Sequence, residues 1–173
     1  MIRIAAAVAV LAMLAVGSAH AAATADPGLS VEANQAFLAA NAKKPGVIVR
    51  PSGLQYRILK SGYGKQPKAT DSVTVYYKGS LINGKVFDST EPGMPSTFQT
   101  NQLIPGWTEA LQLMREGDHW ELVLPAQLAY GPRGAGDAIA PNQTLIFDLQ
   151  LVSVNPPPPQ PQGDDKSAGS GAY

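Results

Sequence analysis

The chain has 173 residues, and its 13 basic side chains balance its 13 acidic ones. This length predicts one folded domain with appendages, since domains usually have about 100–200 residues. Only 15% of the residues are charged and they form no basic stripe, which argues against a nucleic-acid partner. With no cysteine and only two histidines, the chain offers no disulfide, thiolate metal site, cysteine nucleophile or histidine-relayed hydrolase, and we expect neither a metal nor a cofactor.

The first segment, residues 1–21, has the pattern of a cleavable signal peptide. Arg3 precedes an apolar run from Ile4 to Val16, and Ala19-His20-Ala21 is a small-x-small cleavage pattern. The run is shorter than the about 20 residues that span a bilayer; a short membrane anchor or a buried helix is the alternative. We therefore expect export. Because an exported chain without cysteine is common in a bacterial periplasm, this is the expected compartment, with secretion as a further possibility.

A flexible lead and a short helix are expected within residues 22–46. Ser30 can cap the helix, which should end near Lys43, before Pro45-Gly46. Its apolar face would consist of Ala33, Ala36, Phe37 and Ala40. Because that face is mostly alanine, the helix must dock on the rest of the chain or fray.

Residues 47–154 change to the two-residue period of β-strands. Apolar residues alternate with polar ones at Leu54–Lys60, Val73–Ser80, Trp120–Leu124 and Leu145–Leu151. Asn83-Gly84 predicts a tight turn into a further strand at Lys85. Pro105-Gly106 should open one short helix that Gly117 follows closely enough to end. The helix would bury Trp107, Ala110, Leu111 and Met114. Strands with a single helix among them predict an α+β fold with an antiparallel sheet.

Residues 155–173 have little apolar content to bury and begin with four consecutive prolines after Asn155. This composition predicts a disordered, solvated tail. A docking site for a proline-binding module is the alternative interpretation.

The residues that remain as site candidates are mostly aromatic. They come from six separate elements, with apolar residues between them: Tyr77, Phe87, Phe98, Trp107, Tyr130 and Phe147, together with Leu103, Ile104 and Ile139. Packing in the core is the simpler interpretation. Two features favour a pocket: Asp88 follows an aromatic residue where a buried carboxylate would need hydrogen-bond partners, and Tyr130 lies in a loop from which its phenol can project. An apolar pocket with a few polar groups is typical of a site for a neutral ligand. His119 alternates away from the apolar face and is expected to be a solvated surface residue.

Five motifs, in order and at family spacing, resemble the FKBP family of peptidyl-prolyl isomerases. They are Val75-Tyr-Tyr-Lys-Gly79, Asn83-Gly-Lys-Val-Phe-Asp-Ser89, Ile104-Pro-Gly-Trp-Thr-Glu-Ala-Leu111, Leu128-Ala-Tyr-Gly131 and Leu145-Ile-Phe-Asp148. Two flanking stretches, Pro51–Tyr56 and Gln112–Met114, are similar to the bacterial exported Mip and FkpA branch. The resemblance implies that residues 47–154 form a curved antiparallel sheet of five to six strands around one short helix.

The resemblance also implies a role for each candidate. Trp107 would floor a proline pocket, Ile139 would overhang it, and its walls would be Tyr77, Phe87, Phe98, Leu103, Ile104 and Phe147. Asp88 and Tyr130 would make the polar contacts to substrate, forming the catalytic group with Tyr77. The chain departs from the family pattern at Ser96, where eukaryotic members usually carry a wall phenylalanine, and at the loop residues Ala135 and Ala138, which are often bulkier.

The implied function is cis-trans isomerisation of Xaa-Pro bonds in exported proteins. Amide resonance opposes this rotation with a barrier of about 18–20 kcal/mol, and no bond between heavy atoms breaks, so neither a nucleophile nor a cofactor is needed. A proline-binding periplasmic chaperone or adaptor with incidental isomerase activity is the alternative. The expected partners are Xaa-Pro segments of unfolded or exported proteins and macrolide inhibitors of the family, without nucleic acid or stable membrane insertion. The expected state is a monomer.

Overall fold

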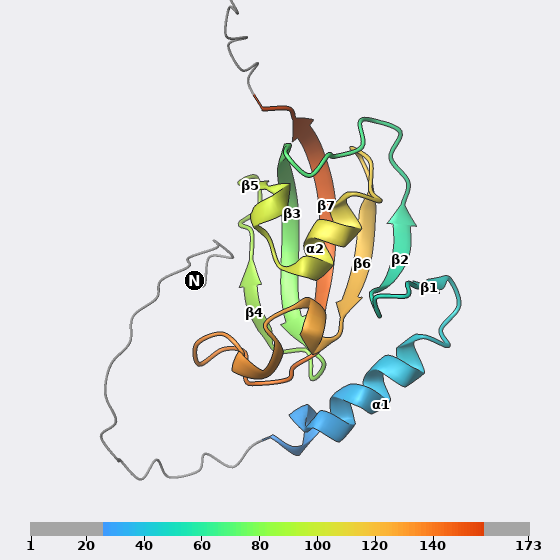
Figure 1. The fold of residues 1–173 in the computed structure, drawn as a ribbon, viewed down its shortest axis with the longest axis vertical. Helices are drawn as coiled ribbons and strands as arrows, with labels where there is room; N and C mark the ends of the chain where they lie inside the picture. Colours follow the sequence, from blue (N-terminus) through green and yellow to red (C-terminus); the bar gives the residue numbers. More distant parts are fainter. Residues whose placement is uncertain (1–25, 158–173) are drawn as a thin grey trace, which may run out of the picture.

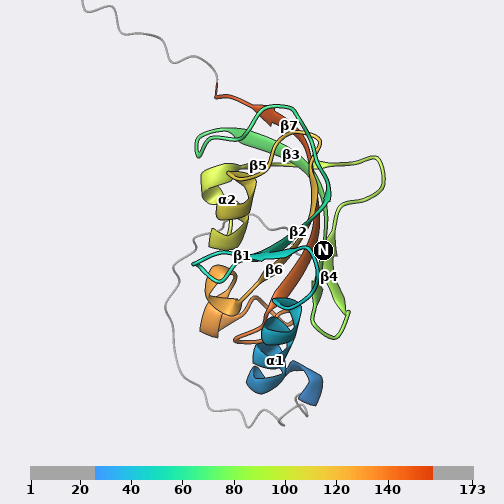
Figure 2. The same cartoon turned by 90° about the vertical axis from the view of Figure 1, so that its right-hand side faces the viewer.

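The computed structural model describes residues 26–157, in which an antiparallel sheet curves around a short helix (Figures 1 and 2). Its strands are β1 (Val47–Val49), β2 (Gln55–Lys60), β3 (Ser72–Leu81), β4 (Val86–Ser89), β5 (Ser96–Gln99), β6 (His119–Leu124) and β7 (Leu145–Asn155). The α-helices are α1 (Val31–Asn41) and α2 (Pro105–Leu111), and short 3-10 turns occur at Pro27–Leu29, Thr100–Gln102, Ala126–Leu128 and Gly131–Arg133. The expected signal peptide and most of the expected tail lie outside the described residues.

The sheet has the strand order β1-β2-β6-β7-β3-β4, and β5 pairs with the other half of the same edge of β3. At its centre β3 and β7 pair from Ser72 opposite Asn155 to Leu81 opposite Leu145. The alternation predicted for β3 is confirmed, because every second residue along it is buried. The α+β class and the curved antiparallel sheet around one helix are likewise confirmed.

Helix α2 lies in the hollow of the sheet and turns Trp107, Ala110 and Leu111 into the core. Pro105 suits its first turn, where a free N–H would have no partner. Gly106 lets the helix approach β6, because a Cβ atom there would lie 2.6 Å from Leu124 Cδ2. The helix ends at Leu111, earlier than the position of Gly117 predicted.

Two strands were not predicted from the sequence. Strand β1 is three residues long and lies at the edge of the sheet, and β5 follows a tight turn at residues 91–94. Both are too short to show a clear two-residue period. They bring the sheet to seven strands, more than the five to six that the family resemblance implied.

Helix α1 begins where it was predicted, since the Ser30 side chain accepts a hydrogen bond from Ala33 N at 3.1 Å. Of the predicted buried face, Ala33 and Phe37 are partly buried, and the rest of the prediction was wrong. Asn34 and Asn41 are the buried residues of the helix, whereas Ala36 and Ala40 are exposed. The helix docks through side-chain amides because these meet hydrogen-bond partners on the sheet domain.

Candidate active site

Trp107 is the centre of a cluster of aromatic rings in the hollow of the sheet. Its side chain is fully buried at the start of α2. Tyr77 and Phe147 meet it edge to face, each with ring centroids 5.2 Å apart, and Phe98 does so at 6.0 Å. Edge-to-face contacts fix ring orientation as well as burying apolar area. The indole is therefore a fixed floor held from three strands.

The register of the sheet brings Phe87 to the same cluster. Gly79 of β3 lies opposite both Asp88 of β4 and Phe147 of β7. A Cβ atom on Gly79 would lie 2.6 Å from Phe87 Cζ and 2.8 Å from Phe147 Cε1. Because glycine leaves this space free, Phe87 packs edge to face on Phe147, with centroids 5.7 Å apart.

The polar group of the site consists of Tyr77, Asp88 and Tyr130. The Tyr77 hydroxyl donates to Asp88 Oδ2 at 2.8 Å, and Asp88 Oδ1 accepts from Ser89 N at 3.0 Å. Burial, followed by the hydrogen bond to Asp88 and the charge of this carboxylate, raises the pKa of Tyr77 far above its usual value. Burial, followed by the Asp88 charge, also raises the pKa of Tyr130. Both phenols are therefore protonated donors at neutral pH.

Two further features form the rim of the site. Leu103 and Ile104 precede α2 and are partly exposed beside the aromatic cluster. Ile139 is 2% exposed and exchanges two backbone hydrogen bonds with Ala135, of 2.8 and 3.1 Å. Tyr130 is partly exposed at the start of the same loop, and the hydrogen bonds within residues 26–157 leave its hydroxyl free.

The structure brings the sequence-predicted site residues together. Nine of the ten belong to one contiguous apolar cluster: Tyr77, Phe87, Phe98, Leu103, Ile104, Trp107, Tyr130, Ile139 and Phe147. The tenth, Asp88, joins them through the hydroxyl of Tyr77. The arrangement offers an aromatic floor, an apolar rim, one carboxylate and one free phenol, which suits a compact apolar ring attached to a polar peptide group.

His119 lies on the outer face of the sheet, as predicted, with its side chain 32% exposed. It is not simply solvated, because its Nε2 atom lies 2.7 Å from Asp148 Oδ1 on the neighbouring strand. Within the described part of the chain, no three His, Asp or Glu side chains come close enough to hold a metal ion.

Sequence reasoning missed the residues that hold the rim in place. Gly79 has no side chain to take part in chemistry but leaves space for the ring of Phe87; its place in the first motif, two residues after Tyr77, was the available signal. Gln143 and Thr144 are buried at the end of the loop that carries Ile139. Polar residues directly before a buried strand were the available signal for these two.

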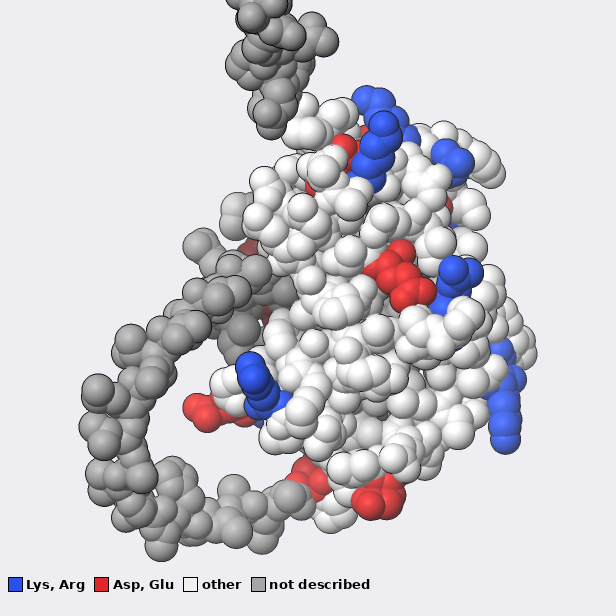
Figure 3. All heavy atoms as spheres, viewed as in Figure 1, with Lys and Arg blue, Asp and Glu red and all other residues white. Residues whose placement is uncertain are grey.

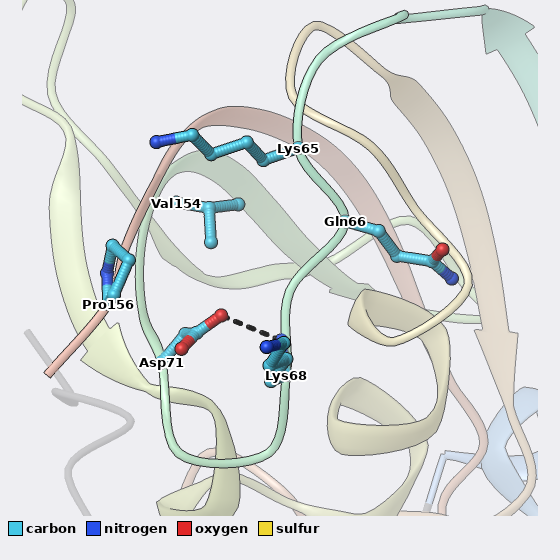
Figure 4. A pocket seen from close by; sticks show the side chains of 6 residues that line it. All are labelled: Lys65, Gln66, Lys68, Asp71, Val154 and Pro156. Carbon is cyan, nitrogen blue, oxygen red and sulfur yellow. Dashed lines mark hydrogen bonds between the residues drawn. The ribbon is translucent and has the colours of Figure 1, made fainter.

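A surface hollow of about 310 Å³ lies elsewhere, between the loop before β3 and the end of β7 (Figure 4). Its lining residues are Lys65, Gln66, Lys68, Asp71, Val154 and Pro156, none of which was a site candidate. The Lys65 and Gln66 side chains extend in different directions, and Asp71 accepts from the backbone of Lys68 at 2.8 Å. Because its polar groups do not converge, we assign the site to the aromatic cluster instead.

The face that presents α2 carries few charges, and these are scattered over it (Figure 3). Such a face suits an uncharged ligand better than a nucleic acid. Among residues 26–157, no helix is long and apolar enough to cross a membrane.

The family model described as FKBP-type peptidyl-prolyl cis-trans isomerase matches residues 64–152, and a model for the domain amino terminal to it matches residues 6–58. Outer membrane protein MIP of Legionella longbeachae is 61% identical over 120 residues, which are 69% of this chain and 52% of that protein. The FKBP-type 22 kDa peptidyl-prolyl cis-trans isomerase of Escherichia coli (strain K12) is 50% identical over 119 residues, 68% of this chain and 58% of that protein.

Solved structures match the chain in the same way as the family models and the two relatives. The crystal structure of a peptidyl-prolyl cis-trans isomerase from Pseudomonas syringae pv. tomato superposes with a TM-score of 0.69 at 40% identity, covering 72% of this chain and 92% of that one. FkpA from Escherichia coli gives a TM-score of 0.68 at 42% identity, covering 71% and 58%. The chain belongs to the FKBP-type peptidyl-prolyl cis-trans isomerase family, as its motifs indicated. It spans little more than half the length of the first two relatives named above.

Proposed function

We propose that the chain is a peptidyl-prolyl cis-trans isomerase that accelerates rotation about Xaa-Pro bonds in exported proteins as they fold. The observation that carries this proposal is the buried Trp107 floor, held edge to face by Tyr77 and Phe147, with Tyr130 and Asp88 at its rim. A proline ring is apolar and compact, and its peptide group is neutral. The aromatic floor matches the apolar proline ring, and the polar groups at the rim match the neutral peptide group.

The geometry supports catalysis by selective binding of the twisted amide. Resonance makes the planar amide the more polar state, and this resonance is lost when the bond twists. An apolar pocket that excludes water therefore disfavours the planar state relative to the twisted one. This difference lowers the barrier to rotation, and each reduction of about 1.4 kcal/mol increases the rate about tenfold.

We assign separate roles to the two polar groups at the rim, Asp88 and Tyr130. Twisting makes the carbonyl carbon of the rotating amide more positive, and the Asp88 carboxylate at the rim stabilises this change. Tyr130 donates to a carbonyl of a neighbouring peptide bond, which anchors the substrate. A donor on the rotating carbonyl would favour the planar state and slow the reaction. Tyr77 holds Asp88 in place through their 2.8 Å hydrogen bond.

We also propose the wider organisation of the chain. Residues 1–21 are an export signal, residues 22–46 a lead with one helix and residues 47–154 the isomerase domain, which β7 extends by one residue to Asn155; the remainder is a solvated tail. The expected location is the periplasm, and the expected partners are proline-containing segments of exported proteins. N-terminal sequencing of the periplasmic protein should find Ala22 or a neighbour as the first residue, and Met1 in its place would contradict this.

Macrolide inhibitors of the family are a further expected ligand class, because they fill an apolar pocket of this kind. The small side chains at Ser96, Ala135 and Ala138 offer such a ligand less contact surface than bulkier residues would.

Refolding of a protein whose slow phase is limited by prolyl isomerisation tests the proposed activity. Catalytic amounts of the chain should accelerate the slow phase without changing the final yield. A proline-binding adaptor, the alternative, would act only at stoichiometric amounts and would retard the phase by holding the unfolded chain.

A further inference from the structure

Helix α1 meets the sheet domain through two asparagines placed seven positions apart, near its two ends. Asn34 is 3% exposed and Asn41 is 2% exposed, although asparagine is usually a surface residue. Burial of an amide is tolerated only when its hydrogen bonds are satisfied. The two asparagines are therefore specific attachment points.

Asn34 attaches the helix to residues Gln143 and Thr144. Its Oδ1 atom accepts from Thr144 N at 2.7 Å, and its Nδ2 atom donates to Gln143 Oε1 at 3.3 Å. Gln143 Nε2 returns a hydrogen bond of 2.9 Å to Leu29 O, just before the helix. All three residues of this attachment are at most 5% exposed.

Asn41 attaches the other end of the helix to a different part of the domain. Its Nδ2 atom donates to Gln55 Oε1 of β2 at 2.9 Å, and Gln55 Nε2 donates to Leu38 O at 3.0 Å. The two attachments are thus similar in burial and chemistry. Only the one at Asn34 reaches the loop between β6 and β7.

That loop carries Tyr130 and Ile139 to the rim of the site. Asn142 N donates to Gly131 O at 2.9 Å, which closes the loop at its base, and Ala135 and Ile139 pair across it. Gly134 lies so close to Ile139 O that a Cβ atom there would clash with it. The loop is therefore a tightly connected unit, and Gln143 and Thr144 form its exit into β7. Figures 1 and 2 both show α1 and this orange loop at the same end of the sheet.

We propose that Asn34 is a positioning residue for substrate, because it holds the exit of the loop that places Ile139 and Tyr130 over the aromatic floor. Helix α1 is then part of the substrate-binding unit and does not merely precede the isomerase domain in the chain. This inference rests on the proposed function, since it assumes that a proline peptide binds at the aromatic cluster.

Asn34→Ala in the full chain tests the inference, with Asn41→Ala as the matched control. NMR titration with a Leu-Pro peptide gives the dissociation constant per folded molecule, and hydrogen exchange reports the protection of the Ile139 amide. Asn34→Ala should weaken binding about three- to tenfold, the loss expected for one or two hydrogen bonds, and should expose the Ile139 amide to exchange. Asn41→Ala should leave both quantities as in the wild type while losing similar stability.

Equal peptide affinity in the two variants would overturn the inference, as would unchanged protection of Ile139. If Asn34→Ala does not fold, Gln143→Ala carries the same test, because it removes part of the attachment and leaves the contacts of Asn34 with Ser30 and Leu29 intact. A wild-type chain that failed to bind the peptide would instead refute the proposed function, and the inference would fall with it.

Discussion

The Tyr77 hydroxyl donates to Asp88 Oδ2 over 2.8 Å, and this bond joins the buried floor of the site to its rim. Tyr77 is 7% exposed and packs edge to face on Trp107, whereas Asp88 is partly exposed. The carboxylate is thus oriented by a buried phenol while it keeps part of its hydration. Charge can be presented to a substrate in this way without the large cost of complete desolvation.

Asp88→Ala should lower kcat/KM at least about tenfold, which is about 1.4 kcal/mol of transition-state stabilisation. The free energy of unfolding should fall by less than about 1 kcal/mol, because water can reach the rim and replace the lost acceptor. Denaturant melts and exchange rates on the same preparation provide both values. A loss of about 1–3 kcal/mol in stability with normal activity per folded molecule would make Asp88 a scaffold residue.

Gly79→Ala should destabilise the domain by about 1–3 kcal/mol, the usual cost of overpacking. The new methyl group would lie against Phe87 and Phe147, and it would displace the ring of Phe87 from the site. Thermal or denaturant unfolding measures this cost. In a Phe87→Leu background the same substitution should cost less, because part of the clash is removed. An equal cost in both backgrounds would show that the backbone, and not the ring, is disturbed.

The sequence predicted the strands with long alternating patterns and the site residues carried by the family motifs. Tyr77, Trp107 and Phe147 are far apart in sequence, and only the register of β3 with β7 and the position of α2 show how their rings meet. The sequence pattern misplaced the buried face of α1 because apolar periodicity cannot reveal a helix that docks through asparagines. The partners of Asn34 on the sheet domain, Gln143 and Thr144, lie more than a hundred residues away, so no local pattern could indicate them.

Stability should decline above about pH 10 through the two site tyrosines. Burial raises the pKa of both Tyr77 and Tyr130 above the ordinary value of 10.0. The unfolded chain therefore ionises first as the pH rises, which favours unfolding; below pH 10 both states are protonated and the contribution is fully present. Denaturant melts across this range should show a shallower decline for Tyr77→Phe. An equal decline in the variant would show that ionisation of Tyr77 does not cause the loss of stability.

The protein should be a monomer in solution. The polar face of α1 is already occupied by Gln55 and Gln143 of its own domain. Its exposed residues are small or polar apart from one larger apolar side chain, Val31. Little apolar area is left on this helix for a partner subunit. Sedimentation equilibrium checks the state directly, and a stable dimer at micromolar concentration would contradict it.

The aromatic pocket, with Asp88 and Tyr130 at its rim, should catalyse rotation about an Xaa-Pro bond without a metal or cofactor. Exchange NMR on a short Leu-Pro peptide tests it most directly, with the protein at a small fraction of the peptide concentration and a chelator present. Cis-trans exchange should accelerate in proportion to the protein concentration, with an unchanged ratio of isomers. Peptide binding without faster exchange, or exchange that disappears in the chelator, would contradict it.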